Sequence, residues 1–468
     1  MKTSKLGAFL AAAMLTLTGC GARKTYDDIQ MPAAEKSTLV PVGNWNTGND
    51  YEGVPAVKEE TKATFSSADG LCRIEVKEHY FDVTLDLTGG DHFAAGAAYS
   101  EALKLAYSGY EEMIENYLYD CMQMVYSEPE ALQEAGITDK YELIRTRLHT
   151  LKAALPEEYQ QELNGFASHF SPQSASFSKN GQLSQDECDL ISLIPDVMRE
   201  AACSGMIVGG SRTASGKRMV SRLMEWDLGS GNSMCDGHCV LRFKNGDKSF
   251  VSVCSVGQLD VTTGMNDDGV FAAILDVGSY EPFGDCAGKI SYTYSVREAL
   301  ETCTTAKAIG TYLNGLTPKF TFNHNVIVTD EQDGFIAENC HLEDAGRPLM
   351  RDETTPLLDN LSWDAEGCIC VVNAFAAAGQ LDLMTNVSGN LLRWMKYDRL
   401  FSGSEKITLS RFKSLMTSEK TDNAFAEIRS NQLVYMVLVD YDSRTLQCTF
   451  TGKNGLADMP DFLDLGTF

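Results

Sequence analysis

The sequence predicts a mixed α+β fold, and three observations lead to this expectation. Residues 72–76 and 81–85 alternate between apolar and polar side chains, which is the two-residue period of β-strands. Residues 92–119 instead carry apolar side chains at helical spacing, and a mostly helical region follows to about residue 200. After residue 203, short apolar runs separated by glycine and asparagine again predict strands. Because these blocks do not follow a βαβ alternation, we expect a layered α+β arrangement.

The first twenty residues predict export and lipidation. A basic start is followed by the apolar run Leu6–Leu17, which is too short to span a bilayer and suits the core of a signal peptide. The run ends in Leu17-Thr18-Gly19-Cys20, which resembles the lipobox of bacterial lipoproteins. We therefore expect a signal peptide over residues 1–19, a diacylglycerol on Cys20 and a location in the cell envelope. The alternative is an ordinary secretory signal with a chance cysteine.

The rest of the chain divides by composition. Residues 20–62 are rich in Thr, Asn, Gly, Pro and charge without sustained periodicity, which predicts a flexible stalk. Residues 63–202 then carry the first strands and helices, and residues 203–468 carry the later elements. In this C-terminal part the expected strands include residues 240–243, 250–253, 270–275, 325–328, 368–372 and 433–439. A helix over residues 295–313 is expected to begin with Ser295 as its cap, and another to lie near residues 390–401.

Charge and cysteine content restrict the partners and the chemistry. The 39 basic and 65 acidic residues give a net charge of −26, so phosphate backbones and anionic lipid surfaces repel the chain. We expect no nucleic-acid partner, and no membrane contact beyond the N-terminal lipid. Of the fourteen cysteines, thirteen remain after Cys20. An odd number in an exported protein predicts at least one free thiol.

The stretch from residue 201 to residue 278 carries the motifs that indicate a reaction. Ala202-Cys203-Ser204-Gly205 opens one expected strand, Ser221–Asp227 forms the next, and Gly264–Val270 follows. These motifs resemble the N-terminal-nucleophile cysteine hydrolases, which include penicillin V acylases, bile salt hydrolases, acid ceramidase and the acyl-CoA:isopenicillin N acyltransferase group. The resemblance runs from about residue 85 to the C-terminus, and its other segments are Leu87–Phe93, Ser295–Glu301, Val372–Phe375 and Asn390–Arg393.

The resemblance implies a four-layer αββα fold that cuts itself between Ala202 and Cys203. Residues 63–202 would then be a pro-segment, residues 203–468 the catalytic domain, and the two chains would stay associated. Cys203 would be the nucleophile. A thiol with a pKa near 8.5 is mostly protonated at neutral pH, but an α-amine with a pKa of about 7.7–8.0 can act as its base once the peptide bond is cut.

Four further residues take their roles from the resemblance. Arg222 and Glu225 correspond to the Arg and Asp that hold the amine and the thiol, with Glu in place of Asp. Positions three apart face opposite sides of a regular strand, so these two act together only if a bulge or bend intervenes. Asn373 corresponds to an oxyanion donor, and Arg393 completes the polar site.

The predicted reaction is hydrolysis of a linear amide, a small-molecule acyl-amide, through an acyl-thioester on Cys203 and without a cofactor. Resolution of the thioester by a second amine gives the first alternative, an acyltransferase. The second alternative is a non-catalytic lipoprotein that binds a ligand on the same fold. We expect no metal, because Cys235 and Cys239 with one intervening histidine lack the second half of a structural zinc site.

Overall fold

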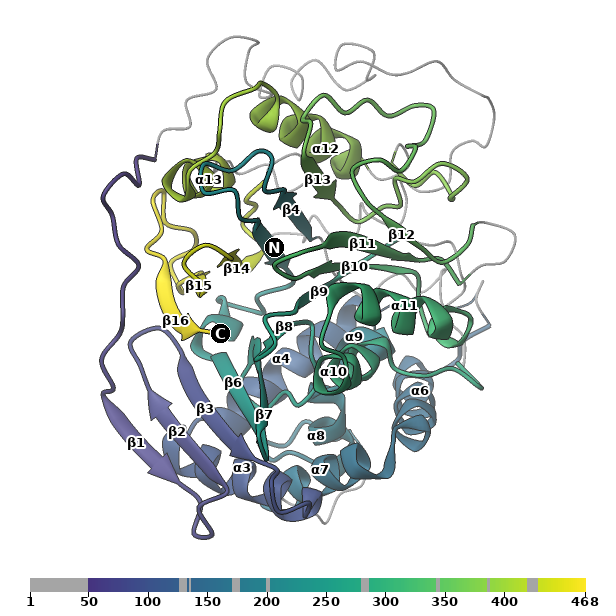
Figure 1. Cartoon of the computed structure of the whole chain (residues 1–468). Helices are drawn as coiled ribbons and strands as arrows, with labels where there is room; N and C mark the ends of the chain where they lie inside the picture. The colour runs from purple at the N-terminus through teal and green to yellow at the C-terminus, as the bar shows by residue number, and fades with distance from the viewer. Residues whose placement is uncertain are drawn as a thin grey trace.

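Two β-sheets face each other in the centre of the molecule, with helices on their outer faces (Figure 1). The computed structural model describes residues 49–125, 133, 136–170, 177–198, 203–278, 286–341, 346–384, 388–418 and 428–468. The predicted signal peptide and Cys20 lie outside these residues. The α+β class predicted from the sequence is confirmed, and the layers follow the order helices, sheet, sheet, helices.

The larger sheet contains ten strands and the smaller sheet six. In spatial order the ten strands are β1 (Ala63–Ser66), β2 (Cys72–Val76), β3 (Phe81–Asp86), β6 (His238–Asn245), β7 (Lys248–Ser255), β8 (Thr263–Asn266), β9 (Phe271–Asp276), β10 (His324–Thr329), β11 (Gly334–Asn339) and β12 (Leu349–Arg351). The six are β13 (Cys368–Val371), β4 (Ser204–Val208), β5 (Met219–Glu225), β14 (Leu433–Asp440), β15 (Thr445–Phe450) and β16 (Leu463–Thr467).

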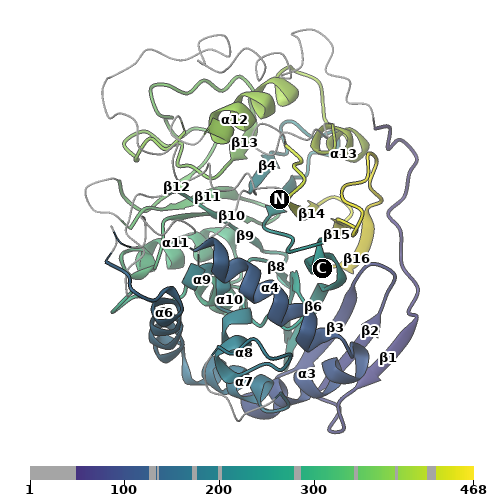
Figure 2. The same ribbon diagram turned by 180° about the vertical axis from the view of Figure 1, so that it is seen from behind.

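Helices cover both outer faces. The helices of the N-terminal part are α3 (His92–Ala106), α4 (Tyr110–Met124), α6 (Lys140–Ala154), α7 (Glu157–Ala167), α8 (Gln185–Ile191) and α9 (Ile194–Met198). They gather at one side of the molecule, where Figure 2 shows them in front. The later helices are α10 (Tyr292–Thr302) and α11 (Ala306–Leu316), which lie on the large sheet, and α12 (Ser388–Phe401) and α13 (Leu409–Met416), which lie on the side of the small sheet (Figure 1).

The part of the chain before Cys203 belongs to the same sheet as the part after it. Strand β3 pairs in parallel with β6, from Phe81 opposite Cys239 to Asp86 opposite Lys244. Strands β1 and β2 extend this edge by antiparallel pairing. Residues 63–86 are therefore bound to the C-terminal part by a complete strand interface and not only by the connecting chain.

The predicted helix over residues 295–313 is two helices with different caps. The hydroxyl of Ser291 accepts from Tyr294 N and caps α10, and the hydroxyl of Thr305 accepts from Ala308 N and caps α11. Ser295, the expected cap, instead donates to Ser291 O within the first turn. The expectation was wrong because two hydroxyl residues lie four positions apart, and the upstream one reaches the free N–H groups of the first turn.

The described end of the predicted stalk packs on the body. Tyr51 is buried and donates through its hydroxyl to Pro460 O at 2.9 Å, while its ring meets Phe462 edge-on at 5.3 Å. Val57 N donates to Phe462 O at 2.7 Å. Residues 51–57 therefore lie against the C-terminal part, in contrast to the flexible stalk expected up to residue 62.

Two further properties concern the described residues only. None of their helices combines the length and the apolar character needed to cross a bilayer. Of the thirteen cysteines among these residues, eleven are buried.

Candidate active site

Cys203 immediately precedes β4, which packs closely against the large sheet at Gly205. Its neighbour Gly205 pairs with Arg222 on one side and with Val371 on the other. A Cβ on Gly205 would lie 2.5 Å from the side chain of Ile327 in the opposite sheet and 2.8 Å from Ser221 O. Only glycine fits there, so the start of β4 is pressed against the large sheet and Cys203 is fully buried.

All three polar atoms of Cys203 are held by side chains. Its nitrogen donates to Asn373 Oδ1 at 2.5 Å. Its carbonyl oxygen accepts from Arg393 Nη1 at 2.8 Å, and its Sγ accepts from Arg222 Nη2 at 3.3 Å. The thiol also lies 3.8 Å from Met224 Sδ and 3.8 Å from Glu225 O. The residues that the sequence assigns to the site are thus brought together around the predicted nucleophile.

Arg222 is buried beside the thiol. Besides Sγ, its Nη2 donates to Ile274 O at 2.9 Å, and its guanidinium lies 5.4 Å from the centre of the Tyr435 ring. Its Nε and Nη1 have no hydrogen-bond partner within the described part of the chain. Donors buried in this way carry a desolvation cost, which an acceptor supplied by a ligand would offset.

The pairing of β5 with the neighbouring strand β14 is irregular beside Glu225. Glu225 pairs with Leu433 and Met224 with Tyr435, so Val434 is an extra residue on β14. The extra residue belongs to β14, and the two side chains keep different partners: Arg222 contacts Ile274 O of the large sheet, whereas Glu225 faces Arg393 on α12. Glu225 Oε2 lies 3.3 Å from Arg393 Nη1, and Ser430 N donates to Oε1 at 3.1 Å.

Asn373 and Arg393 form the other half of the site. Arg393 Nη2 donates to Asn373 Oδ1 at 3.0 Å and to Asn390 Oδ1 at 2.9 Å. Asn373 Nδ2 donates to Asp276 O at 2.8 Å. In this arrangement Asn373 binds the nitrogen of Cys203, and its predicted role as an oxyanion donor stays a prediction. Ala202, the other half of the predicted cleavage site, lies outside the described residues.

Burial and charge act in opposite directions on the buried site groups. Burial raises the pKa of the Cys203 thiol, while the guanidinium groups of Arg222 and Arg393 lower it. Burial also raises the pKa of Glu225, against the lowering effect of Arg393 and of the hydrogen bonds from Ser430. The net shift of the Cys203 pKa is upward, so the thiol is protonated at neutral pH, and Arg222 lies where it would stabilise a thiolate.

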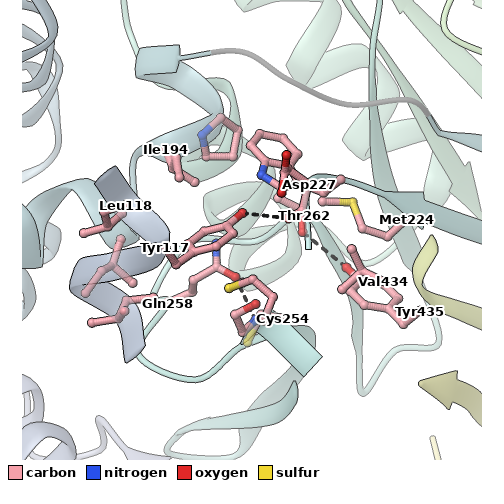
Figure 3. A pocket seen from close by; sticks show the side chains of 16 residues that line it. Tyr117, Leu118, Ile194, Met224, Asp227, Cys254, Gln258, Thr262, Val434 and Tyr435 are labelled. Atoms are coloured by element: carbon pink, nitrogen blue, oxygen red, sulfur yellow. Dashed lines mark hydrogen bonds between the residues drawn. The ribbon is translucent and has the colours of Figure 1, made fainter. Parts of the chain in front are cut away.

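A mostly apolar cavity of about 40 Å³ adjoins these residues. Met224 and Tyr435, which contact Cys203 and Arg222 respectively, line one side of it, and Tyr117, Leu118 and Ile194 line the other (Figure 3). The remaining lining residues are Ile114, Ile191, Pro195, Trp226, Asp227, Met234, Cys254, Ser255, Gln258, Thr262 and Val434. Helices α4 and α9 of the N-terminal part thus share the cavity wall with strands β5 and β14.

No set of three His, Cys, Asp or Glu side chains suited to a metal ion occurs within the described ranges. The Cys235–Cys239 segment instead forms a short 3-10 helix and the start of β6. His238, between the two cysteines, is buried and its Nε2 is bonded to Thr451 O at 2.8 Å.

Sequence reasoning missed three residues that contact the site. Asn390 holds Arg393, Tyr435 lies against the Arg222 guanidinium, and Ser430 N binds Glu225. Asn390 belongs to the segment Asn390–Arg393 named above. Its position three residues before Arg393 places both on the same helix face, and this spacing could have predicted the contact. Tyr435 and Ser430 carry no local signal, because they meet the site only through the pairing of β14 with β5.

Comparison with known proteins adds structural likeness at low identity. No protein-family model matches the sequence, and no curated protein is similar to it in sequence. Among solved structures, a Caenorhabditis elegans ortholog of N-acylethanolamine-hydrolyzing acid amidase shares 12% identity over 51% of this chain and 92% of its own, with a TM-score of 0.35. A mutant of the conjugated bile acid hydrolase from Clostridium perfringens shares 11% over 56% and 92%, with a TM-score of 0.36. Penicillin V acylase from Agrobacterium tumefaciens shares 12% over 53% and 83%, with a TM-score of 0.31.

Proposed function

We propose that this chain is a self-processing cysteine amidohydrolase with Cys203 as its nucleophile. The observation that carries the proposal is the way Cys203 is held: its nitrogen on Asn373, its carbonyl on Arg393 and its sulfur on Arg222. A structural cysteine in a core needs none of these contacts. A nucleophile whose own nitrogen must act as its base needs both atoms oriented.

The proposed maturation converts the peptide nitrogen of Cys203 into a free amine. The thiol attacks the carbonyl of Ala202, so that a C–S bond replaces the C–N bond. Water then hydrolyses the thioester, which leaves a carboxylate on Ala202 and a free amine on Cys203. Asn373 Oδ1 is already 2.5 Å from this nitrogen and orients it toward the thiol after the cut.

In the proposed reaction the mature enzyme repeats the same chemistry on a separate amide. The amine takes the proton of the thiol, the thiolate attacks the acyl carbonyl, and the proton passes to the leaving amine as the C–N bond breaks. Arg222 stabilises the thiolate, and its Nε and Nη1, which have no hydrogen-bond partner among the described residues, are donors available to the acyl oxygen. Water then hydrolyses the acyl-thioester and releases the acid. No step requires a cofactor.

The cavity beside Met224 supports a short apolar acyl group as the substrate class. A volume of about 40 Å³ corresponds to roughly three water molecules by the same measure. The lining is mostly aliphatic, aromatic and sulfur-containing, so an unbranched apolar chain fits it better than a charged one.

The proposal includes an N-terminal lipid anchor on Cys20 in the bacterial cell envelope. Its support is the order of basic, apolar and small residues before Cys20 in the sequence. A diacylglycerol on this residue would be seen in the mass of the smaller chain, and Cys20→Ala would lack it.

The nucleophile is tested by labelling and by turnover. Iodoacetamide should alkylate Cys203 before any other thiol, as located by peptide mass spectrometry. Hydrolysis of a series of acyl p-nitroanilides, from acetyl to octanoyl, should be abolished in Cys203→Ala and should favour the shorter acyl groups. Cys448→Ala is the matched control, because Cys448 is equally buried in the same sheet and lies outside the site. Turnover that survives in Cys203→Ala contradicts the proposal.

A further inference from the structure

The backbone around Asn373 is no longer held by a β-ladder. Strand β13 ends at Val371, whose partner on β4 is Gly205. The next residues, 372–374, lie beside Cys203 beyond the end of this pairing. Backbone carbonyl groups buried at such a point need other donors.

Side-chain amides supply these donors for three successive carbonyl groups. Asn325 Nδ2 donates to Val372 O at 3.1 Å and to Ala374 O at 3.0 Å. Asn390 Nδ2 donates to Asn373 O at 3.0 Å. The two amides come from different elements, β10 of the large sheet and α12 on the small sheet. The residue that binds the nitrogen of Cys203 is therefore clamped from both sides of the sandwich.

The burial of Asn325 destabilises the folded state. It is fully buried on a strand whose other members are mostly apolar, and its Oδ1 has no hydrogen-bond partner among the described residues. A buried acceptor without a donor is destabilising, because it loses its hydrogen bond to water and gains none in the protein. An apolar residue would avoid this cost but would leave the carbonyl groups of Val372 and Ala374 without a donor.

We infer that Asn325 is a positioning residue that acts through Asn373. By fixing the backbone on both sides of Asn373, it fixes Oδ1 of that residue and hence the nitrogen of Cys203. This inference rests on the proposed function, because the nitrogen matters as a base only in the self-processed enzyme. Asn390 shares the clamp but also holds Arg393, so Asn325 is the residue whose replacement isolates the effect.

The test measures how fast iodoacetamide alkylates Cys203 in the purified protein at pH values from 5 to 9. In Asn325→Leu the rate at pH 7 should fall about tenfold, which is part of the roughly hundredfold that a full displacement of about 1 Å at a reacting group costs. The apparent pKa of the alkylation should rise, because a misplaced amine no longer favours the thiolate. Asn373→Ala should show the same change, and the double variant should be no slower than Asn373→Ala alone.

The matched control is Asn323→Leu. Asn323 is equally buried, lies two residues earlier in the chain, and binds a backbone N–H through Oδ1, that of His341 at 2.9 Å. Its replacement should lower thermal stability and leave the alkylation profile within about twofold of wild type, because it touches no group of the site. Asn325→Ser, which keeps a hydroxyl donor, is a second variant that should show an intermediate rate if Asn325→Leu does not fold.

The outcomes separate the two proposals. A wild-type Cys203 that is not alkylated ahead of the other thiols contradicts the proposed function. A reactive wild-type Cys203 with an unchanged profile in the Asn325 variants contradicts the positioning role alone. The positioning role is also contradicted if the effects of Asn325→Leu and Asn373→Ala on the alkylation rate multiply in the double variant. It is contradicted as well if Asn323→Leu shifts the alkylation profile as much as Asn325→Leu does.

Discussion

Arg393 joins more of the site than any other single residue described above. Its guanidinium donates to Cys203 O, Asn373 Oδ1 and Asn390 Oδ1 and faces the carboxylate of Glu225. All of these groups are buried, so the loss of any one of them leaves a polar partner without a hydrogen bond in the core. Removing the cation leaves a carboxylate in the core without its partner.

Arg393→Met should therefore destabilise the protein by about 3–5 kcal/mol at neutral pH, the cost of breaking a buried ion pair from one side. The pKa of Glu225 is already raised by burial, so without Arg393 the carboxyl should take up a proton as the pH falls. The destabilisation, measured as the shift in the urea midpoint, should accordingly be smaller at pH 5 than at pH 7.5.

The double variant Arg393→Met/Glu225→Gln is the control for this reasoning. Because the glutamine is neutral, the double variant should be more stable than Arg393→Met alone at pH 7.5. A loss of stability that is equal at both pH values, or equal in the single and double variants, argues against an unpaired charge as the cause.

At the residue scale, the sequence could predict the groups that carry a motif but not those that support them. Cys203, Arg222, Glu225, Asn373 and Arg393 lie within recognisable local patterns, and the structure places them around one sulfur atom. Asn325 contacts the site through a hydrogen bond from its side-chain amide to the backbone carbonyl of Val372, which lies 47 residues later in the sequence. A buried amide on a strand has no pattern of its own, so this contact is visible only in three dimensions.

At the scale of elements, the interface between helix α9 of the N-terminal part and helix α10 of the C-terminal part contains a buried carboxyl group. Asp196 on α9 accepts from Ser291 Oγ at 2.8 Å, Tyr292 N at 2.7 Å and Thr293 Oγ1 at 2.7 Å, all at the start of α10. Asp260, also buried, lies close enough to interact with it electrostatically. Burial raises the pKa of Asp196 from 3.8 to about 6, against the lowering effect of its hydrogen bonds.

The contribution of Asp196 to the free energy of unfolding should decrease as the pH rises from about 4 to about 6. The unfolded chain loses the Asp196 proton near pH 3.8 while the folded chain keeps it to about pH 6, so the stabilisation is complete below pH 3.8 and is lost by pH 6. The difference of about two pKa units corresponds to about 3 kcal/mol. Relative to wild type, Asp196→Asn should therefore gain in unfolding free energy between pH 4 and pH 6.5. A difference between the two proteins that does not change with pH contradicts this assignment.

The elements themselves were predicted well where periodicity alone decides. Strands β10, β13 and β14 and helix α12 fall within two residues of their predicted ends. The break between α10 and α11 was missed, because the choice among several hydroxyl caps depends on tertiary partners such as Asp196. The packing of Tyr51 on the body was also missed, because a single aromatic residue in a polar segment carries no periodic signal.

At the scale of the whole molecule, the parts before and after Cys203 form one body. Strand β3 pairs with β6 along its whole length. Glu162 on α7 binds Arg297 on α10 through two hydrogen bonds of 2.5 and 2.8 Å, with both side chains buried. A cut before Cys203 would leave all of these contacts in place.

The proposed cleavage should therefore yield two chains that co-purify and separate only in denaturant. Residues 20–202 and 203–468 correspond to about 20 and 29 kDa of the 51.3 kDa chain. Cys203→Ala, which lacks the attacking thiol, should remain one chain, whereas Cys448→Ala should be processed like wild type. Two chains in Cys203→Ala would show that another protease makes the cut.

The most direct test of the central claim is the N-terminal sequence and intact mass of the larger chain of active wild-type protein. The account predicts that it begins Cys-Ser-Gly-Met, with the nitrogen of Cys203 free to act as the base. An active protein in which the Ala202–Cys203 bond is intact would leave the thiol without that base and would contradict the mechanism.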